Sequence, residues 1–179
     1  MRNLFLILSL IVLGGCNSVL AKNHGSDNKS FKLDEKWRPL EEIQERGAIL
    51  GTAIKGNSII TTVGHIAYVE NLEEYLAIRP PGSIAFESIM THEQVHSRRQ
   101  LKTGLYTWIS RYLVDKEFAL AEEKIGYYHQ MRINMSLQPE TVAKFLSTYK
   151  IASGYLVSEA DALTWARAAR AGQWVPEED

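Results

Sequence analysis

The sequence contains very little cysteine and has no excess of charge of either sign. Only one of its 179 residues is a cysteine, so no disulfide can form within the chain. The formal net charge is −1, and no basic stretch with interleaved aromatic residues occurs, which argues against a nucleic-acid partner. Hydrophobic residues make up 45% and charged residues 23%, a composition typical of globular proteins.

The apolar run at the N-terminus is too short to span a bilayer. It extends from Leu4 to Leu13 and follows a positively charged residue, Arg2. A basic residue followed by a short apolar segment is typical of a signal peptide. We therefore expect residues 1–15 to be a targeting segment that is removed from the mature protein.

The single cysteine follows this segment directly. Leu13-Gly14-Gly15-Cys16 resembles the lipobox of bacterial lipoproteins, and an ordinary signal peptide with an incidental cysteine is the alternative. The resemblance implies lipid attachment at Cys16 and a membrane-anchored lipoprotein of the cell envelope. Asn17, where an aspartate would favour retention at the inner membrane, implies the outer membrane. Residues 16–36 are rich in Asn, Ser, Lys and Gly, so we expect a flexible tether.

The rest of the chain, residues 37–179, is expected to form one domain of the α+β class. Turn residues, caps and hydrophobic periodicity predict a short helix, then a small antiparallel sheet, then a bundle of helices. The helix is expected over residues 39–46 and strands over 48–54 and 58–69. Further helices are expected over 83–101, 106–113, 116–135, 139–149 and from 159 to a stop at Gly172.

One of these helices carries the pattern His-Glu-x-x-His, formed by His92, Glu93 and His96. Residues four apart lie on the same face of an α-helix, so both imidazoles can point at one metal ion. Glu93 lies beside that face, where it can reach a water molecule at the metal. This is the arrangement that a zinc hydrolase needs. Two buried structural histidines are the alternative interpretation.

A catalytic zinc site usually has three protein ligands and one open position. Two neighbouring acids on the downstream helix, Glu122 and Glu123, are candidates for the third ligand. A shift of one residue turns a helix by about 100°, so only one of the two can face the metal. Gly126 lies one turn after Glu123, and its small size would let two helices approach closely.

With these residues in place, the chain resembles a short gluzincin, a metallopeptidase whose zinc is held by two histidines and one glutamate. Gluzincins carry the glutamate on a second helix, often followed at the third position by alanine, where this chain has Gly126. The resemblance implies a zincin-like fold, a zinc ion held by His92, His96 and Glu123, and Glu93 as the catalytic base. It also implies a peptide or protein substrate.

The sequence leaves two questions open. The donor that stabilises the oxyanion is expected among Tyr127, Tyr128, His129 and Tyr155, which the sequence does not rank. The alternative to a peptidase is a non-catalytic envelope lipoprotein that uses a zincin-like fold as a structural or peptide-binding module.

Overall fold

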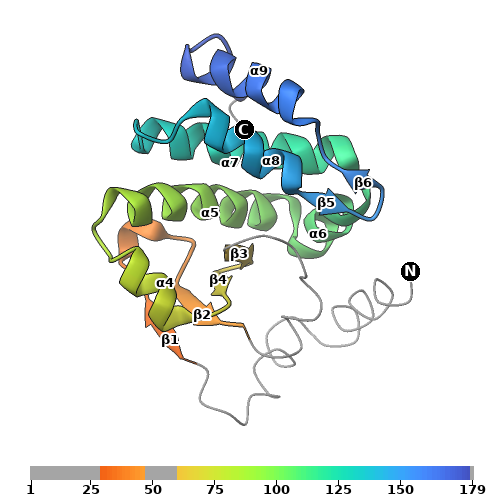
Figure 1. Ribbon diagram of the computed structural model, residues 1–179. Helices are drawn as coiled ribbons and strands as arrows, with labels where there is room; N and C mark the ends of the chain where they lie inside the picture. The colour runs from red at the N-terminus through yellow and green to blue at the C-terminus, as the bar shows by residue number, and fades with distance from the viewer. Residues whose placement is uncertain (1–28, 47–59, 178–179) are drawn as a thin grey trace.

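The structure, a computed structural model, describes residues 29–46 and 60–177. Helix α5 crosses the middle of the molecule, with a four-stranded sheet and α4 on one side and α7, α8 and α9 on the other (Figure 1). The elements in chain order are β1 (Ser30–Lys32), η1 (Glu35–Trp37), β2 (Glu42–Glu45), β3 (Ile60–Val63), β4 (Ile66–Val69), α4 (Leu72–Ile78), α5 (Ile84–Thr103), α6 (Leu105–Val114), α7 (Lys116–Ile133), α8 (Pro139–Thr148), β5 (Lys150–Ile151), β6 (Gly154–Tyr155) and α9 (Glu159–Arg170). The expected α+β class is confirmed.

The sheet is mixed, so the prediction of an antiparallel sheet is wrong. Its strand order is β1-β2-β4-β3, with β2 and β4 parallel and the two outer pairs antiparallel. The helix expected over residues 39–46 is also wrong, because Glu42–Glu45 form β2 and pair with strands on both sides. Burial of Ile43 in the core outweighs the helical preference of the acidic residues around it.

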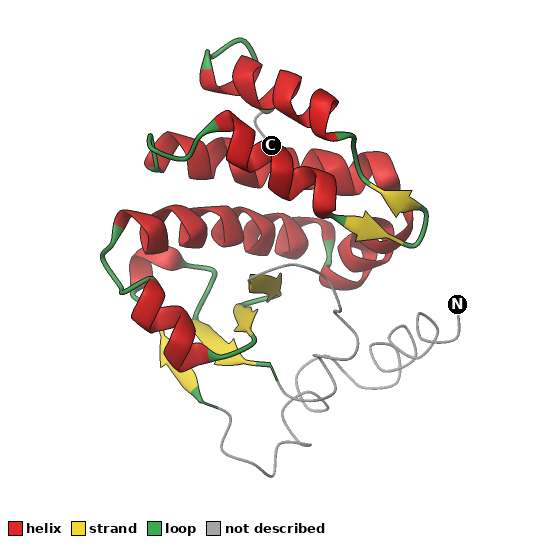
Figure 2. Cartoon of the chain, in the orientation of Figure 1, coloured by secondary structure: helices red, strands yellow, loops and turns green. Residues whose placement is uncertain are grey.

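Further elements differ from the sequence prediction. Strand β1 lies within the expected tether, so the fold includes residues that precede Trp37. Helix α4 is new, although Asn71 gives the signal for it by accepting a hydrogen bond from the backbone N–H of Glu74. The short β5–β6 hairpin is also new (Figure 2). The single strand expected over residues 58–69 is wrong, because a turn at Gly64 divides it into β3 and β4, which pair as a hairpin. The strand expected over residues 48–54 lies outside the described residues.

The helices after residue 83 agree with the prediction because their ends follow local capping rules. Ser83, Asp115 and Ser158 each accept a hydrogen bond from a backbone N–H in the first turn of α5, α7 and α9. Gly104 ends α5 with a φ of 90°, a conformation that glycine adopts without strain. These caps fix where the helices that carry the candidate site begin and end.

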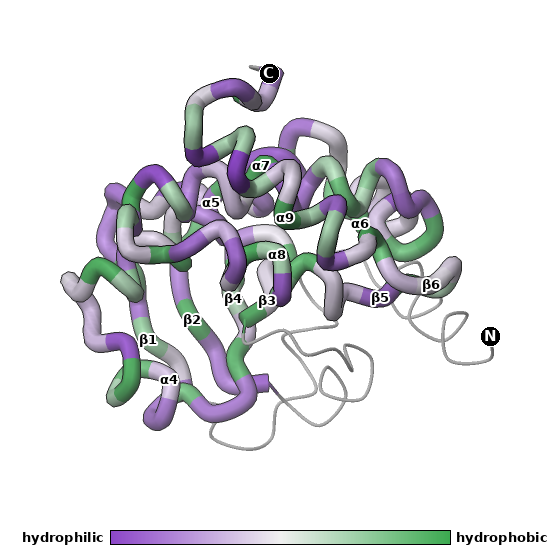
Figure 3. The backbone as a smooth tube through the Cα atoms, turned by 45° about the horizontal axis from the view of Figure 1, so that its top comes forward, coloured by the Kyte–Doolittle hydropathy of each residue, from purple (hydrophilic) through white to green (hydrophobic). Residues whose placement is uncertain are grey.

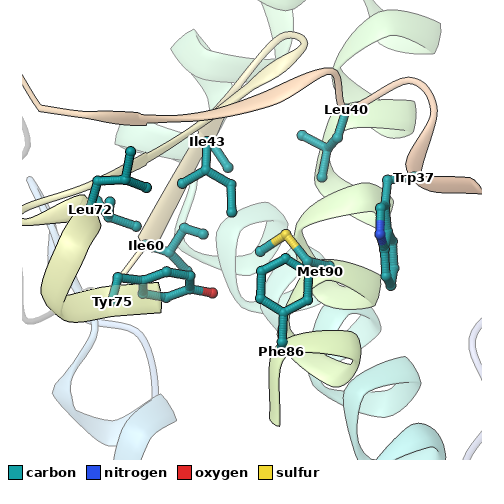
Figure 4. Packing of buried hydrophobic residues seen from close by; sticks show 10 residues of the cluster. Trp37, Leu40, Ile43, Ile60, Leu72, Tyr75, Phe86 and Met90 are labelled. Carbon is teal, nitrogen blue, oxygen red and sulfur yellow. The ribbon is translucent and has the colours of Figure 1, made fainter. Parts of the chain in front are cut away.

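Two hydrophobic clusters lie on opposite sides of α5. The first joins the sheet, α4 and the beginning of α5, and Figure 4 shows its side chains converging from these elements. The second joins α7, α8 and α9 and includes Trp165 and Leu146. Burying a large apolar side chain stabilises a fold by about 1.5–3 kcal/mol. The first cluster therefore joins α5 to the sheet, the second joins α7 to α8 and α9, and α5 and α7 pack directly against each other.

The structure describes no residue of the expected signal peptide or of the lipidation site, so Cys16 lies outside the described residues. Within residues 29–46 and 60–177, no helix combines the length and the apolar character needed to cross a bilayer. The labelled helices contain both hydrophilic and hydrophobic residues (Figure 3).

Candidate metal centre

Helix α5 is buried on two faces, one toward α7 and the other toward the sheet. His92 and His96 lie on the face toward α7, where 4% and 5% of these residues are exposed. Ser97 and Gln100 lie on the face toward the sheet and bond to backbone atoms of the β3–β4 hairpin. These hydrogen bonds fix the rotation of α5 relative to the sheet, and they thereby aim the two imidazoles at α7.

Helix α7 brings Glu123 against the two histidines. The Nε2 atoms of His92 and His96 are 2.9 Å apart. The Glu123 carboxylate lies 3.7 Å from the first, through Oε2, and 3.6 Å from the second, through Oε1. Donor atoms at the corners of a tetrahedral zinc site are about 3.3 Å apart, given zinc–donor bonds of 2.0–2.1 Å. The three side chains are therefore spaced to hold one metal ion.

An unpartnered oxygen supports this interpretation. The Oε2 atom of Glu123 is buried and has no hydrogen-bond partner among the described residues. A buried carboxylate oxygen without a partner is unfavourable, because it has lost its hydration and gained nothing in exchange. A cation between Oε2 and the two imidazole nitrogens would satisfy it. The residues present therefore fit a divalent metal ion, whose identity the geometry leaves open.

Close approach of α5 and α7 depends on Gly126. A Cβ atom at this position would lie 2.5 Å from Nε2 of His92 and 2.6 Å from Cδ2 of the same ring. Both distances are far below van der Waals contact. Glycine is therefore required here because the imidazole occupies the space that any side chain would fill.

Glu122 does not face the histidines. Its carboxylate accepts two hydrogen bonds from Arg99, at 2.8 Å from Nε and 2.9 Å from Nη2. Arg99 also lies on α5, so this bidentate ion pair joins the same two helices as the candidate metal group. Of the two adjacent acids, Glu123 faces the imidazoles and Glu122 fixes the helices beside them.

We expect the Arg99→Met substitution to lower the free energy of unfolding of the metal-free protein by about 3 kcal/mol, because it leaves the buried Glu122 carboxylate without this partner. Urea unfolding measures the change. The double variant Arg99→Met/Glu122→Leu serves as the control and should recover most of the loss, since neither charge then remains buried. Equal stability of the parent and the single variant would contradict the prediction.

Gln130 fixes the tautomer of His92. Its side-chain oxygen lies 3.0 Å from Nδ1 of the ring and accepts a hydrogen bond from the N–H group at that position. Nε2 of His92 then presents its lone pair to the space shared with His96 and Glu123. An outer hydrogen bond of this kind typically orients a metal-binding histidine.

The electrostatics of the group formed by His92, His96 and Glu123 favour positive charge. Burial lowers the pKa of His92, but the carboxylates of Glu123 and Glu93 outweigh burial and raise it above its ordinary value. Burial, together with the neighbouring His92 ring, lowers the pKa of His96. Burial raises the pKa of Glu123, but the two imidazoles and the Tyr112 hydroxyl lower it overall. The raised pKa of His92 and the lowered pKa of Glu123 both indicate a local field that favours positive charge beside the carboxylate, which a metal cation would also supply.

Glu93 lies beside the metal group and is held by the sheet. Its Oε2 atom accepts a hydrogen bond of 2.7 Å from the hydroxyl of Thr62, on β3. Only 6% of Glu93 is exposed. The charge of Glu93 also affects the pKa of both His92 and His96, so the carboxylate is within electrostatic reach of the candidate metal position.

The four residues expected to supply an oxyanion donor lie in different environments. Tyr127 packs edge-on against His92, with ring centroids 4.6 Å apart. Tyr128 belongs to the second hydrophobic cluster, and His129 contacts its ring. Tyr155 is 59% exposed on β6. Of these four residues, only Tyr127 therefore contacts the candidate metal group.

Two other tyrosines near the group were not predicted. The hydroxyl of Tyr112, on α6, donates to Oε1 of Glu123. The hydroxyl of Tyr149, at the end of α8, lies 3.4 Å from that of Tyr127. Burial and the Glu123 charge raise the pKa of both residues well above the usual range, so the hydroxyls stay protonated. Tyr112 lies on α6 and Tyr149 at the end of α8, whereas Glu123 lies on α7. No helical periodicity in the sequence therefore relates either tyrosine to Glu123.

Comparison of the chain with protein-family models, with curated proteins and with solved structures finds no match. The functional argument therefore depends on the geometry and chemistry of the site itself.

Proposed function

We propose that the protein is a membrane-anchored zinc peptidase of the bacterial cell envelope. The observation that carries this proposal is the convergence of His92, His96 and Glu123 from two helices, with a buried carboxylate oxygen that lacks a hydrogen-bond partner among the described residues. Glu93, which follows the first of these residues, supplies an acid–base group. This combination supports a zincin-like fold and the gluzincin type of site within it.

Zinc is the proposed ion because two imidazoles and one carboxylate are the ligands of several zinc hydrolases. The same donors also suit iron(II), so metal content has to be measured. When bound, zinc polarises a carbonyl group and lowers the pKa of water. The protein's own contribution is to hold the three donors, to keep His92 in one tautomer through Gln130, and to place Glu93 nearby.

Glu93 is the proposed general base. It accepts a proton from the water that attacks the peptide carbonyl, and it returns this proton to the amine that leaves. The Thr62 hydroxyl donates a hydrogen bond to Oε2 of Glu93, and this bond orients the carboxylate. Tyr127 and Tyr149 offer protonated hydroxyls near the group, and they are the proposed donors to the oxyanion.

The proposed location depends on the N-terminal segment. Cleavage before Cys16 and lipid attachment would tether the domain to the membrane, and more than one acyl chain gives lasting attachment. An envelope peptidase would then act on peptides or proteins at the membrane surface. Asn17 supports the outer membrane as the site of attachment.

Burial favours a second function, a non-catalytic metal-stabilised lipoprotein or peptide-binding module. The three candidate ligands and Glu93 are each no more than 6% exposed. A structural metal site is closed to solvent, whereas a catalytic one must admit substrate. The two functions predict the same metal content but different turnover.

The experiment that separates them uses the full chain in mild detergent. After metal-replete purification, elemental analysis should find one zinc ion per chain. A pool of fluorescence-quenched peptides should be hydrolysed by the zinc-loaded protein and not after chelation. One zinc ion without hydrolysis would support the non-catalytic function. Absence of bound metal would refute both functions.

A further inference from the structure

We propose that Tyr112 is a positioning residue that makes Glu123 bind the metal through one oxygen only. The inference rests on the proposed metal-binding function and deepens it. It assigns a task to a residue on α6, an element that supplies none of the three candidate ligands.

The two oxygens of Glu123 have different surroundings. Oε1 accepts a hydrogen bond from the hydroxyl of Tyr112. Oε2 is buried, lies 3.7 Å from Nε2 of His92 and has no hydrogen-bond partner among the described residues. Oε1 lies 3.6 Å from Nε2 of His96, but the hydroxyl proton withdraws electron density from this oxygen and takes one of its two lone pairs. Oε2 is therefore the oxygen left for the metal.

The position of Tyr112 is itself well determined. Its ring stacks on Trp108 at a centroid distance of 4.7 Å and an interplanar angle of 15°. Trp108 in turn packs edge-on against His96, with ring centroids 5.8 Å apart. The stack therefore connects one candidate ligand to another through α6, and it holds the Tyr112 ring where its hydroxyl reaches Glu123.

The consequence concerns the number of open positions at the metal. Two imidazoles and a single carboxylate oxygen give three protein bonds and leave a fourth position for a small molecule. A carboxylate that binds through both oxygens fills that position or forces five-coordination. Tyr112 thus preserves the open position, which a purely structural site does not need.

A different task for Tyr112 would be direct donation to the substrate. A catalytic donor affects turnover and leaves the resting metal site unchanged. A positioning residue changes the metal site itself, even without substrate. Metal spectroscopy therefore separates the two tasks independently of any peptidase assay.

The test uses the metal-free full chain titrated with Co²⁺ and with Zn²⁺. We expect the parent protein to give the intense visible absorption of four-coordinate Co²⁺. The Tyr112→Phe variant, which keeps the ring stack, should give the weaker absorption of five-coordinate Co²⁺ and bind Zn²⁺ about ten-fold more weakly. Tyr106→Phe, on an exposed part of the same helix, is the matched control and should behave as the parent does.

A second measurement needs no variant. In the infrared difference spectrum between the metal-free and zinc-loaded parent, one-oxygen binding gives widely separated carboxylate stretching bands, and two-oxygen binding gives closely spaced bands. Closely spaced bands would overturn the inference. So would identical spectra and affinities for Tyr112→Phe and Tyr106→Phe, including the case in which only turnover falls. A parent that binds neither metal would instead refute the proposed function.

Discussion

The Glu93→Gln protein is expected to bind one zinc ion per chain and to hydrolyse peptides at least about 10³-fold more slowly than the parent. Glutamine has nearly the same shape as glutamate, and its side-chain oxygen can still accept the hydrogen bond from Thr62. The substitution therefore removes the base and leaves the packing in place. Elemental analysis gives the metal content, and cleavage of a quenched fluorescent peptide gives the rate.

Glu87→Gln is the matched control for this variant. Glu87 lies on the same helix, but its carboxylate is paired with Lys36 at 2.9 Å, away from the metal group. The control should keep both zinc and activity. Full activity in Glu93→Gln would exclude this residue as the base, and loss of zinc would show that its charge serves metal binding instead.

The Gly126→Ala substitution is expected to weaken zinc binding by at least about 100-fold, because loss of an inner ligand should exceed the effect of losing an outer hydrogen bond. The new methyl group would meet the ring of His92 at 2.5 Å. The ring must then turn away, which removes a donor and breaks its bond to Gln130. Competition titration against a coloured zinc chelator measures the affinity.

Helix propensity acts in the opposite direction at this position. In a helix interior, alanine is more favourable than glycine by about 1 kcal/mol, so weaker zinc binding would not arise from a weaker helix. The control variant Ala121→Gly, on the exposed side of α7, should reduce stability by a similar amount and leave zinc affinity unchanged. Parent-like zinc affinity in Gly126→Ala would contradict the close approach of α5 and α7.

The sequence predicts most of the helical part of this fold because the relevant signals are local. Ser83, Asp115 and Ser158 cap their helices by hydrogen bonds that span only a few residues. The spacing of His92 and His96 likewise needs nothing beyond the helical repeat. The helical repeat alone therefore locates the candidate metal-binding face of α5, without knowledge of the tertiary structure.

The sheet and the outer parts of the site are less predictable because they depend on distant contacts. The parallel pairing of β2 with β4 brings together residues that are far apart in the chain, and no short-range pattern indicates its direction. Tyr112 contacts Glu123 across the break between α6 and α7. The choice between Glu122 and Glu123 likewise becomes clear only when Arg99 is seen to bind the former.

The near-complete enclosure of His92, His96 and Glu123 has a kinetic consequence. An ion held by these three side chains would have little direct contact with solvent, so its departure, like the entry of a substrate, would require a transient separation of α5 from α7. Sub-global opening of this kind is infrequent, because it disrupts well-packed helices. Chelators should therefore strip the protein at a rate that does not depend on chelator concentration. Mild denaturant should accelerate this loss long before the chain unfolds.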